Sequence, residues 1–82
     1  ERQNMPGIEK LINRLKTNPK SASFEDLDKI LVSLGYERRN SGGSHFVYRM
    51  KGAPTQTLPR QKPMKICYVK DTLKIYEELK GK

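Results

Sequence analysis

The stretch that decides the fold is residues 40–49, which read Asn-Ser-Gly-Gly-Ser-His-Phe-Val-Tyr-Arg. Its glycine pair predicts a tight turn, because glycine adopts backbone conformations that other residues avoid. In the run from Ser44 to Met50, large apolar residues then occupy every second position, at Phe46, Tyr48 and Met50, which indicates a half-buried β-strand. Alternate residues share a face, so the strand has one face with Phe46, Tyr48 and Met50 and another with His45, Val47 and Arg49. We expect the first face to be buried and the second to be open.

Two shorter strands are predicted on either side of this one. Residues 36–39 precede the glycine turn, and residues 55–58 follow a second turn at residues 51–54 and stop before Pro59. Strands joined by short turns pair with each other in antiparallel fashion. The sequence therefore predicts a three-stranded antiparallel meander.

Three segments with helical periodicity complete the chain, at residues 8–16, 24–34 and 67–80. Ser23 is expected to cap the second helix and Gly35 to end it in a left-handed conformation. The acidic residues in its first turns suit capping and solubility better than a metal site; they are Glu25, Asp26 and Asp28. The apolar stripe expected for the third helix is Val69, Leu73, Tyr76 and Leu79.

The predicted order is helix, helix, three strands, helix, and the fold class is α+β. The helix stripes are expected to cover the sheet face that carries Tyr48, which leaves the His45 face to solvent or to a ligand. The chain has 82 residues, enough for one domain. We expect that domain to span residues 5–82, with residues 1–4 as a tag or leader remnant before Met5.

Composition narrows the setting in which this domain works. Cys67 is the single cysteine, so no internal disulfide can form, and a reducing cytoplasm is the expected compartment. No apolar run reaches the length of a membrane span, so no membrane role is expected.

Positive charge is concentrated in one part of the sequence. The formal net charge is +8. Between residues 36 and 65 the only acidic residue is Glu37, and the basic residues are Arg38, Arg39, Arg49, Lys51, Arg60, Lys62 and Lys65. Such a local excess is typical of a surface that binds nucleic-acid phosphates. An acidic protein is the second kind of partner that this charge would attract.

His45 is the only histidine, and imidazole can exchange a proton near neutral pH. RNA carries its own nucleophile, the 2′-hydroxyl, so one base, one acid and cationic side chains suffice for cleavage without a metal or a cofactor. A surface histidine with no chemistry is the plain alternative. One histidine and one cysteine cannot complete a metal site, so none is expected.

The chain resembles the HicA family of bacterial toxins, the toxin halves of HicA–HicB toxin–antitoxin pairs. The similar segments are residues 23–31 (Ser-Phe-Glu-Asp-Leu-Asp-Lys-Ile-Leu), 34–36 (Leu-Gly-Tyr), 43–49 (Gly-Ser-His-Phe-Val-Tyr-Arg) and 63–70 (Pro-Met-Lys-Ile-Cys-Tyr-Val-Lys). The resemblance implies a fold like that of double-stranded-RNA-binding domains and activity as a ribosome-independent mRNA interferase. It also implies that His45 is the catalytic residue of a Gly-Ser-His motif with Gly43 and Ser44. A HicB antitoxin is then the expected protein partner.

Two segments depart from the family pattern. Residues 65–71 read Lys-Ile-Cys-Tyr-Val-Lys-Asp, whereas the family often has Lys-Pro-Tyr-Gln-Val-Lys-Gln there. This difference is expected to change the entry into the last helix and to leave Cys67 half-buried. The helix at residues 8–16 occurs in only some relatives, and we expect it to cover the core.

The leading hypothesis is therefore a metal-independent endoribonuclease toxin in which His45 is the general acid and base. The residues expected to hold RNA phosphates are Gly43, Ser44, Arg38, Arg39, Arg49, Lys51 and Lys62. The main alternative is an RNA-binding module of double-stranded-RNA-binding type without cleavage. A third reading is a module whose basic face docks an acidic protein, which is compatible with a toxin that an antitoxin covers.

Overall fold

The computed structural model describes residues 6–40, 42–61 and 64–80. Its elements, in chain order, are α1 (Pro6–Thr17), the 3₁₀ turn η1 (Pro19–Ser21), α2 (Phe24–Leu34), β1 (Glu37–Asn40), β2 (His45–Arg49), β3 (Gln56–Pro59) and α3 (Ile66–Lys80). The predicted α+β class and the order α-α-β-β-β-α are confirmed. The expectation for residues 1–4 and the phosphate role expected of Lys62 lie outside the described residues.

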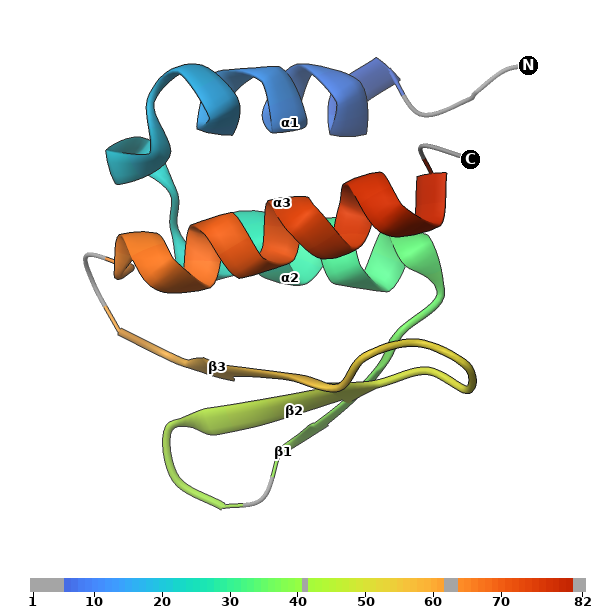
Figure 1. Ribbon diagram of the computed structural model, residues 1–82. Coiled ribbons are helices and arrows are strands. Elements are labelled where there is room, and N and C mark those ends of the chain that lie inside the picture. Colours follow the sequence, from blue (N-terminus) through green and yellow to red (C-terminus); the bar gives the residue numbers. More distant parts are fainter. Residues whose placement is uncertain (1–5, 41, 62–63, 81–82) are drawn as a thin grey trace.

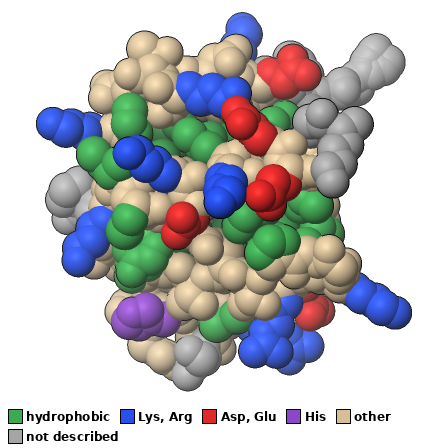
Figure 2. All heavy atoms as spheres, viewed as in Figure 1, with side chains coloured by type: hydrophobic (Ala, Val, Ile, Leu, Met, Phe, Trp, Pro, Cys, Tyr) green, Lys and Arg blue, Asp and Glu red, His purple; other side chains and the backbone are tan. Residues whose placement is uncertain are grey.

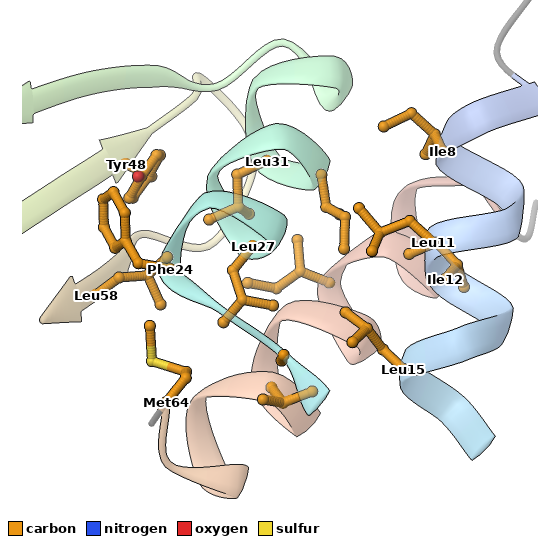
Figure 3. Close-up of a cluster of buried hydrophobic side chains, with 14 of the residues drawn as sticks. Ile8, Leu11, Ile12, Leu15, Phe24, Leu27, Leu31, Tyr48, Leu58 and Met64 are labelled. Atoms are coloured by element: carbon orange, nitrogen blue, oxygen red, sulfur yellow. The ribbon is translucent and has the colours of Figure 1, made fainter. Parts of the chain in front are cut away.

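The elements are arranged in layers (Figure 1). The sheet lies on one side, α2 and α3 cover one of its faces, and α1 lies beyond them, away from the sheet. Only two helices therefore reach the sheet, whereas the sequence led us to expect three. As expected, α1 covers the core: Leu11, Ile12 and Leu15 point from it toward α2 and α3 (Figure 3).

The sheet is an antiparallel meander with β2 in the centre. On the face toward α2, Phe46 pairs with Leu58, and Tyr48 lies between Arg38 and Gln56. On the other face Val47 lies between Arg39 and Thr57, and His45 pairs with Pro59. We call this second side of the sheet the outer face. The strand β3 includes Pro59, which the sequence had placed beyond its end; an edge strand tolerates proline because the missing N–H breaks no ladder bond.

The second helix has both predicted ends. The Ser23 hydroxyl accepts a hydrogen bond from the Asp26 N–H, and the Asp26 carboxylate accepts one from the Ser23 N–H, both at 3.2 Å. Gly35 follows the helix at φ +107°, and its N–H bonds to the Leu31 and Val32 carbonyl groups. These contacts satisfy backbone groups that a helix end leaves unpaired.

The third helix buries a different stripe from the one predicted. Val69, Thr72 and Ile75 are buried, Leu73 and Tyr76 are half-buried, and Leu79 is exposed. Cys67 is exposed, so the expectation of a half-buried thiol was wrong. None of the helices in residues 6–40, 42–61 and 64–80 has the length and apolar character needed to cross a membrane.

Candidate nucleic-acid interface

His45 begins the central strand and is exposed at the rim of the sheet (Figure 2). Tyr48, three residues along the same strand, points to the opposite face of the sheet and is fully buried, at 0% exposure. The packing of Tyr48 and Phe46 against α2 thus fixes the direction of β2 and turns the imidazole toward solvent, as strand alternation predicts. An exposed imidazole at the start of a rigid strand is accessible to a large polyanion.

The loop before His45 is held by Asn40. The Asn40 side-chain oxygen accepts a hydrogen bond from the Gly42 N–H at 2.6 Å, and its amide group donates to the Gly43 carbonyl at 3.4 Å. Gly42 and Gly43 have φ of +91° and +90°, a conformation that L side chains rarely adopt. Chain neighbours aside, no atom of the described residues lies within 4 Å of the position that a Cβ would take at either glycine. The loop backbone is thus open to a phosphate group beside His45. Asn40 is a positioning residue that the sequence analysis left without a role.

Two of the predicted phosphate ligands, Arg39 and Arg49, lie on the outer face with His45. Arg39 pairs with Val47, which places it diagonally next to His45, at a Cα separation of about 7–8 Å. Arg49 is four residues along the strand, or about 13 Å away. Glu37 lies 3.4 Å from the Arg39 Nε atom, with which it forms an ion pair, and it is the register partner of Arg49. All three side chains are exposed.

The remaining predicted ligands are more scattered. Ser44 is exposed next to His45, and its carbonyl accepts a hydrogen bond from the Arg60 N–H at 2.6 Å. Lys51 is exposed in the turn after β2, at the far end of the strand from His45. The structure therefore gathers Gly43, Ser44 and Arg39 around His45 and leaves Lys51 apart.

Arg38 is on the opposite face of the sheet from His45. Its guanidinium group bonds to Asp28 Oδ1 at 3.0 Å and lies 5.9 Å from the centre of the Phe46 ring. The same carboxylate oxygen accepts a hydrogen bond from the Tyr48 hydroxyl at 2.6 Å. Burial, and then the hydrogen bond to Asp28, raise the pKa of Tyr48 far above its usual value. Arg38 thus joins β1 to α2. Its ion pair with Asp28 competes with the phosphate contact that the sequence suggested.

Arg60 is a backbone neighbour of the Gly-Ser-His segment that was not predicted from the sequence. Its backbone is tied to Ser44, and its side chain lies 5.8 Å from the centre of the Phe24 ring and 3.9 Å from Glu25. Arg60 and Gln61 line a pocket of about 270 Å³ together with the start of α2, where Ser23, Phe24 and Glu25 lie. In the sequence, Arg60 is one of several basic residues between positions 36 and 65. The register of β3 against β2 shows that it is a neighbour of the Gly-Ser-His segment.

Within residues 6–40, 42–61 and 64–80, no group of three or more histidine, cysteine and acidic side chains could hold a metal ion. Comparisons of the chain with protein-family models, with curated proteins and with solved structures found no match. The resemblance to HicA toxins therefore stays a prediction.

Proposed function

We propose that this protein is a HicA-like toxin, a metal-independent endoribonuclease that cleaves mRNA in the bacterial cytoplasm. The observation that carries the proposal is the position of His45, exposed on the outer face next to an open glycine loop and Arg39. The exposed Cys67 thiol suits a reducing compartment. A HicB-like antitoxin is the proposed inhibitor, and the accessible rim of the sheet is the surface that it would cover.

The proposed reaction is an internal transfer of the phosphodiester. The His45 imidazole removes the proton from a ribose 2′-hydroxyl, and that oxygen forms a bond to the adjacent phosphorus. The bond from phosphorus to the 5′-oxygen breaks, and the leaving oxygen takes a proton from the imidazolium or from water. The products are a 2′,3′-cyclic phosphate and a 5′-hydroxyl, so no external electron or metal is needed.

Cationic and backbone groups near His45 suit the charge that develops in this reaction. The Arg39 guanidinium is the nearest arginine on the same face, and the loop at Gly42 and Gly43 lets backbone N–H groups approach a phosphate oxygen. Such donors stabilise the extra negative charge on the phosphorane more than the charge of the ground state. Arg49 and Lys51, farther along the sheet, are suited to hold phosphates of the flanking nucleotides.

The proposal is tested with purified protein, labelled RNA and EDTA. We expect cleavage that leaves cyclic-phosphate ends, and His45→Ala is expected to slow it by about 10²–10⁴-fold. Asn13→Ala, at an exposed position of α1, is the matched control and should cleave like the wild type. A substrate with a single 2′-deoxyribose at the cleaved position should remain intact. Equal cleavage by the wild type and His45→Ala would remove His45 from the mechanism.

One observation favours the alternative, an RNA-binding module without cleavage. Among the described residues, none forms a hydrogen bond with the His45 imidazole, whereas catalytic histidines are usually oriented by a second group. The same experiment decides between the two. A gel shift of intact RNA that falls with salt, with a slope near −0.7 per phosphate contact, would favour binding alone.

A further inference from the structure

We propose that the groove between α1, η1 and α3 binds an acidic peptide segment of a partner protein that inserts one apolar side chain between lysines. This groove lies between α1 and the helix layer that covers the sheet, whereas the candidate RNA site lies at the rim of the sheet. The two sites can therefore be occupied independently. The inference does not depend on whether the protein cleaves RNA.

The groove has a volume of about 390 Å³, and its floor is apolar. Leu15 of α1 forms the buried base, and Pro19 of η1 and Leu73 of α3 are half-buried along the walls. Figure 2 shows exposed hydrophobic side chains between basic ones over this part of the molecule. An apolar floor offers nothing to a sugar–phosphate backbone, but it can bury one aliphatic or aromatic side chain of a peptide.

Positive charge surrounds that floor. Lys70, Leu73, Lys74 and Glu77 are spaced at i, i+3, i+4 and i+7, so they share one face of α3. Glu77 forms an ion pair with Lys16 of α1. Within the described part of the chain, no carboxylate lies within ion-pair distance of Lys70 or Lys74. A peptide with carboxylates on both sides of its apolar residue would complement these two lysines.

The groove on the other side of α1 shows why the apolar lining favours the α3 side. It has a similar volume, about 330 Å³, and its lining includes Lys10, Lys29 and Arg14. Each groove contains one carboxylate that is paired with a cation of α1, Asp26 here and Glu77 on the α3 side. The second groove offers the side chain of Leu11 as its apolar surface, whereas the α3 groove offers three apolar side chains, so the second groove matches the first in charge but not in its floor. Lys10 and Lys29 are exposed, so they provide a matched control for Lys70 and Lys74.

The test uses the full chain and a fluorescent twelve-residue peptide that has one central leucine between runs of glutamate. A second peptide has serine in place of the leucine. Binding is followed by fluorescence anisotropy, and the site is located by the backbone amide shifts of isotope-labelled protein. We expect the leucine peptide to shift amides near Lys16, Leu73 and Lys74 and to bind about tenfold more tightly than the serine peptide, as expected for a buried side chain.

Substitutions then separate the groove from general attraction. Lys70→Glu with Lys74→Glu should lower the affinity for the leucine peptide by about tenfold or more, because two complementary contacts become repulsive. Lys10→Glu with Lys29→Glu makes the same change in net charge and should lower the affinity for the leucine peptide by only about twofold, since distant charges are screened. Circular dichroism of each variant shows that it is folded. Equal losses in the two double variants, amide shifts confined to the sheet, or equal affinity for the two peptides would overturn the proposal. Displacement of the peptide by RNA, or a dimer that closes the groove, would overturn it as well.

Discussion

Arg38 and Arg39 are neighbours in the chain, yet they lie in different environments. On the helix-covered face, Arg38 is held by Asp28 beside Tyr48 and Phe46. On the outer face, Arg39 is exposed near His45 with only the weak contact to Glu37. Successive residues of a strand face opposite sides of the sheet, so a run of basic residues is divided between the two faces. Every second cation is available to a ligand, and the cations between them can be used by the fold.

Polar groups on the two faces of the sheet are expected to have different roles. Groups on the helix-covered face are partly desolvated, so losing a partner there costs stability. Groups on the outer face are hydrated, so changing them should have little effect on folding, and under the proposed function the effect appears in RNA binding instead. The predictions below test this division, starting with the largest expected effect.

Tyr48→Ala and Val47→Ala compare the two faces at adjacent positions. Tyr48 is fully buried and its hydroxyl donates to Asp28, so we expect its loss to lower the free energy of unfolding by about 3–5 kcal/mol. Val47 is half-buried on the outer face, and its loss should cost about 1 kcal/mol or less. Urea unfolding of both variants measures the difference. Similar losses would mean that the outer face is packed in solution.

Tyr48→Phe isolates the hydroxyl group. It should lower the free energy of unfolding by about 1.5–3 kcal/mol at neutral pH, the range for a hydrogen bond to a charged group. The raised pKa of Tyr48 also predicts a pH dependence. Below the usual tyrosine pKa of 10.0 both states hold the proton, and stability is unaffected. Above it the unfolded chain loses the proton first, so the stability of the wild type falls as pH rises.

The phenylalanine variant should show a smaller decline above pH 10, because one of the two tyrosines with a raised pKa is gone. Tyr36 accounts for the rest: its hydroxyl donates to the Pro54 carbonyl, and burial is the main cause of its raised pKa. Tyr36→Phe is thus the matched control. Identical pH profiles for the wild type and Tyr48→Phe would show that the Tyr48 hydroxyl is hydrated.

Much of the fold followed from local patterns in the sequence. The alternation around Phe46 and Tyr48, the cap at Ser23 and the end at Gly35 each depend on a few neighbouring residues, and each is confirmed. The stripe of α3 was less predictable, because several choices of apolar residues fit a helical period. Packing against α1 and α2 selected Thr72 and Ile75 over Leu79.

The candidate site was predictable only in part. Strand alternation alone gave the exposed His45 and the face that it shares with Arg49. Only the pairing of β1 with β2 shows that Arg39, and not Arg38, lies on the same face. The contact between Arg38 and Asp28 could not be predicted, since it depends on how α2 lies over the sheet. The same holds for Arg60, which the strand register brings next to Ser44.

Arg39→Ala and Arg38→Ala test the division through RNA binding. We expect Arg39→Ala to weaken the binding of single-stranded RNA. The slope of log affinity against log salt concentration should become smaller by about 0.7, as the loss of one phosphate contact predicts. Arg38→Ala should leave the slope unchanged and lower the free energy of unfolding instead, because Asp28 loses a partner. Filter binding over a range of salt concentrations and urea unfolding measure the two effects. An equal loss of slope in both variants would contradict the separation of the faces.

Glu37→Gln is the smallest and most selective change. The carboxylate lies 3.4 Å from Arg39 Nε, so it would compete with a phosphate for that arginine, and its negative charge lies on the strand position opposite Arg49. Removing its charge should raise RNA affinity about twofold to fivefold, in line with the modest energies of exposed ion pairs. Glu9→Gln makes the same charge change on α1, where salt screens its effect on the sheet, and should alter affinity less. If both variants gain equally, RNA responds only to net charge and the outer face has no defined site. If only Glu37→Gln gains, the arginines beside this carboxylate are the ones that meet RNA.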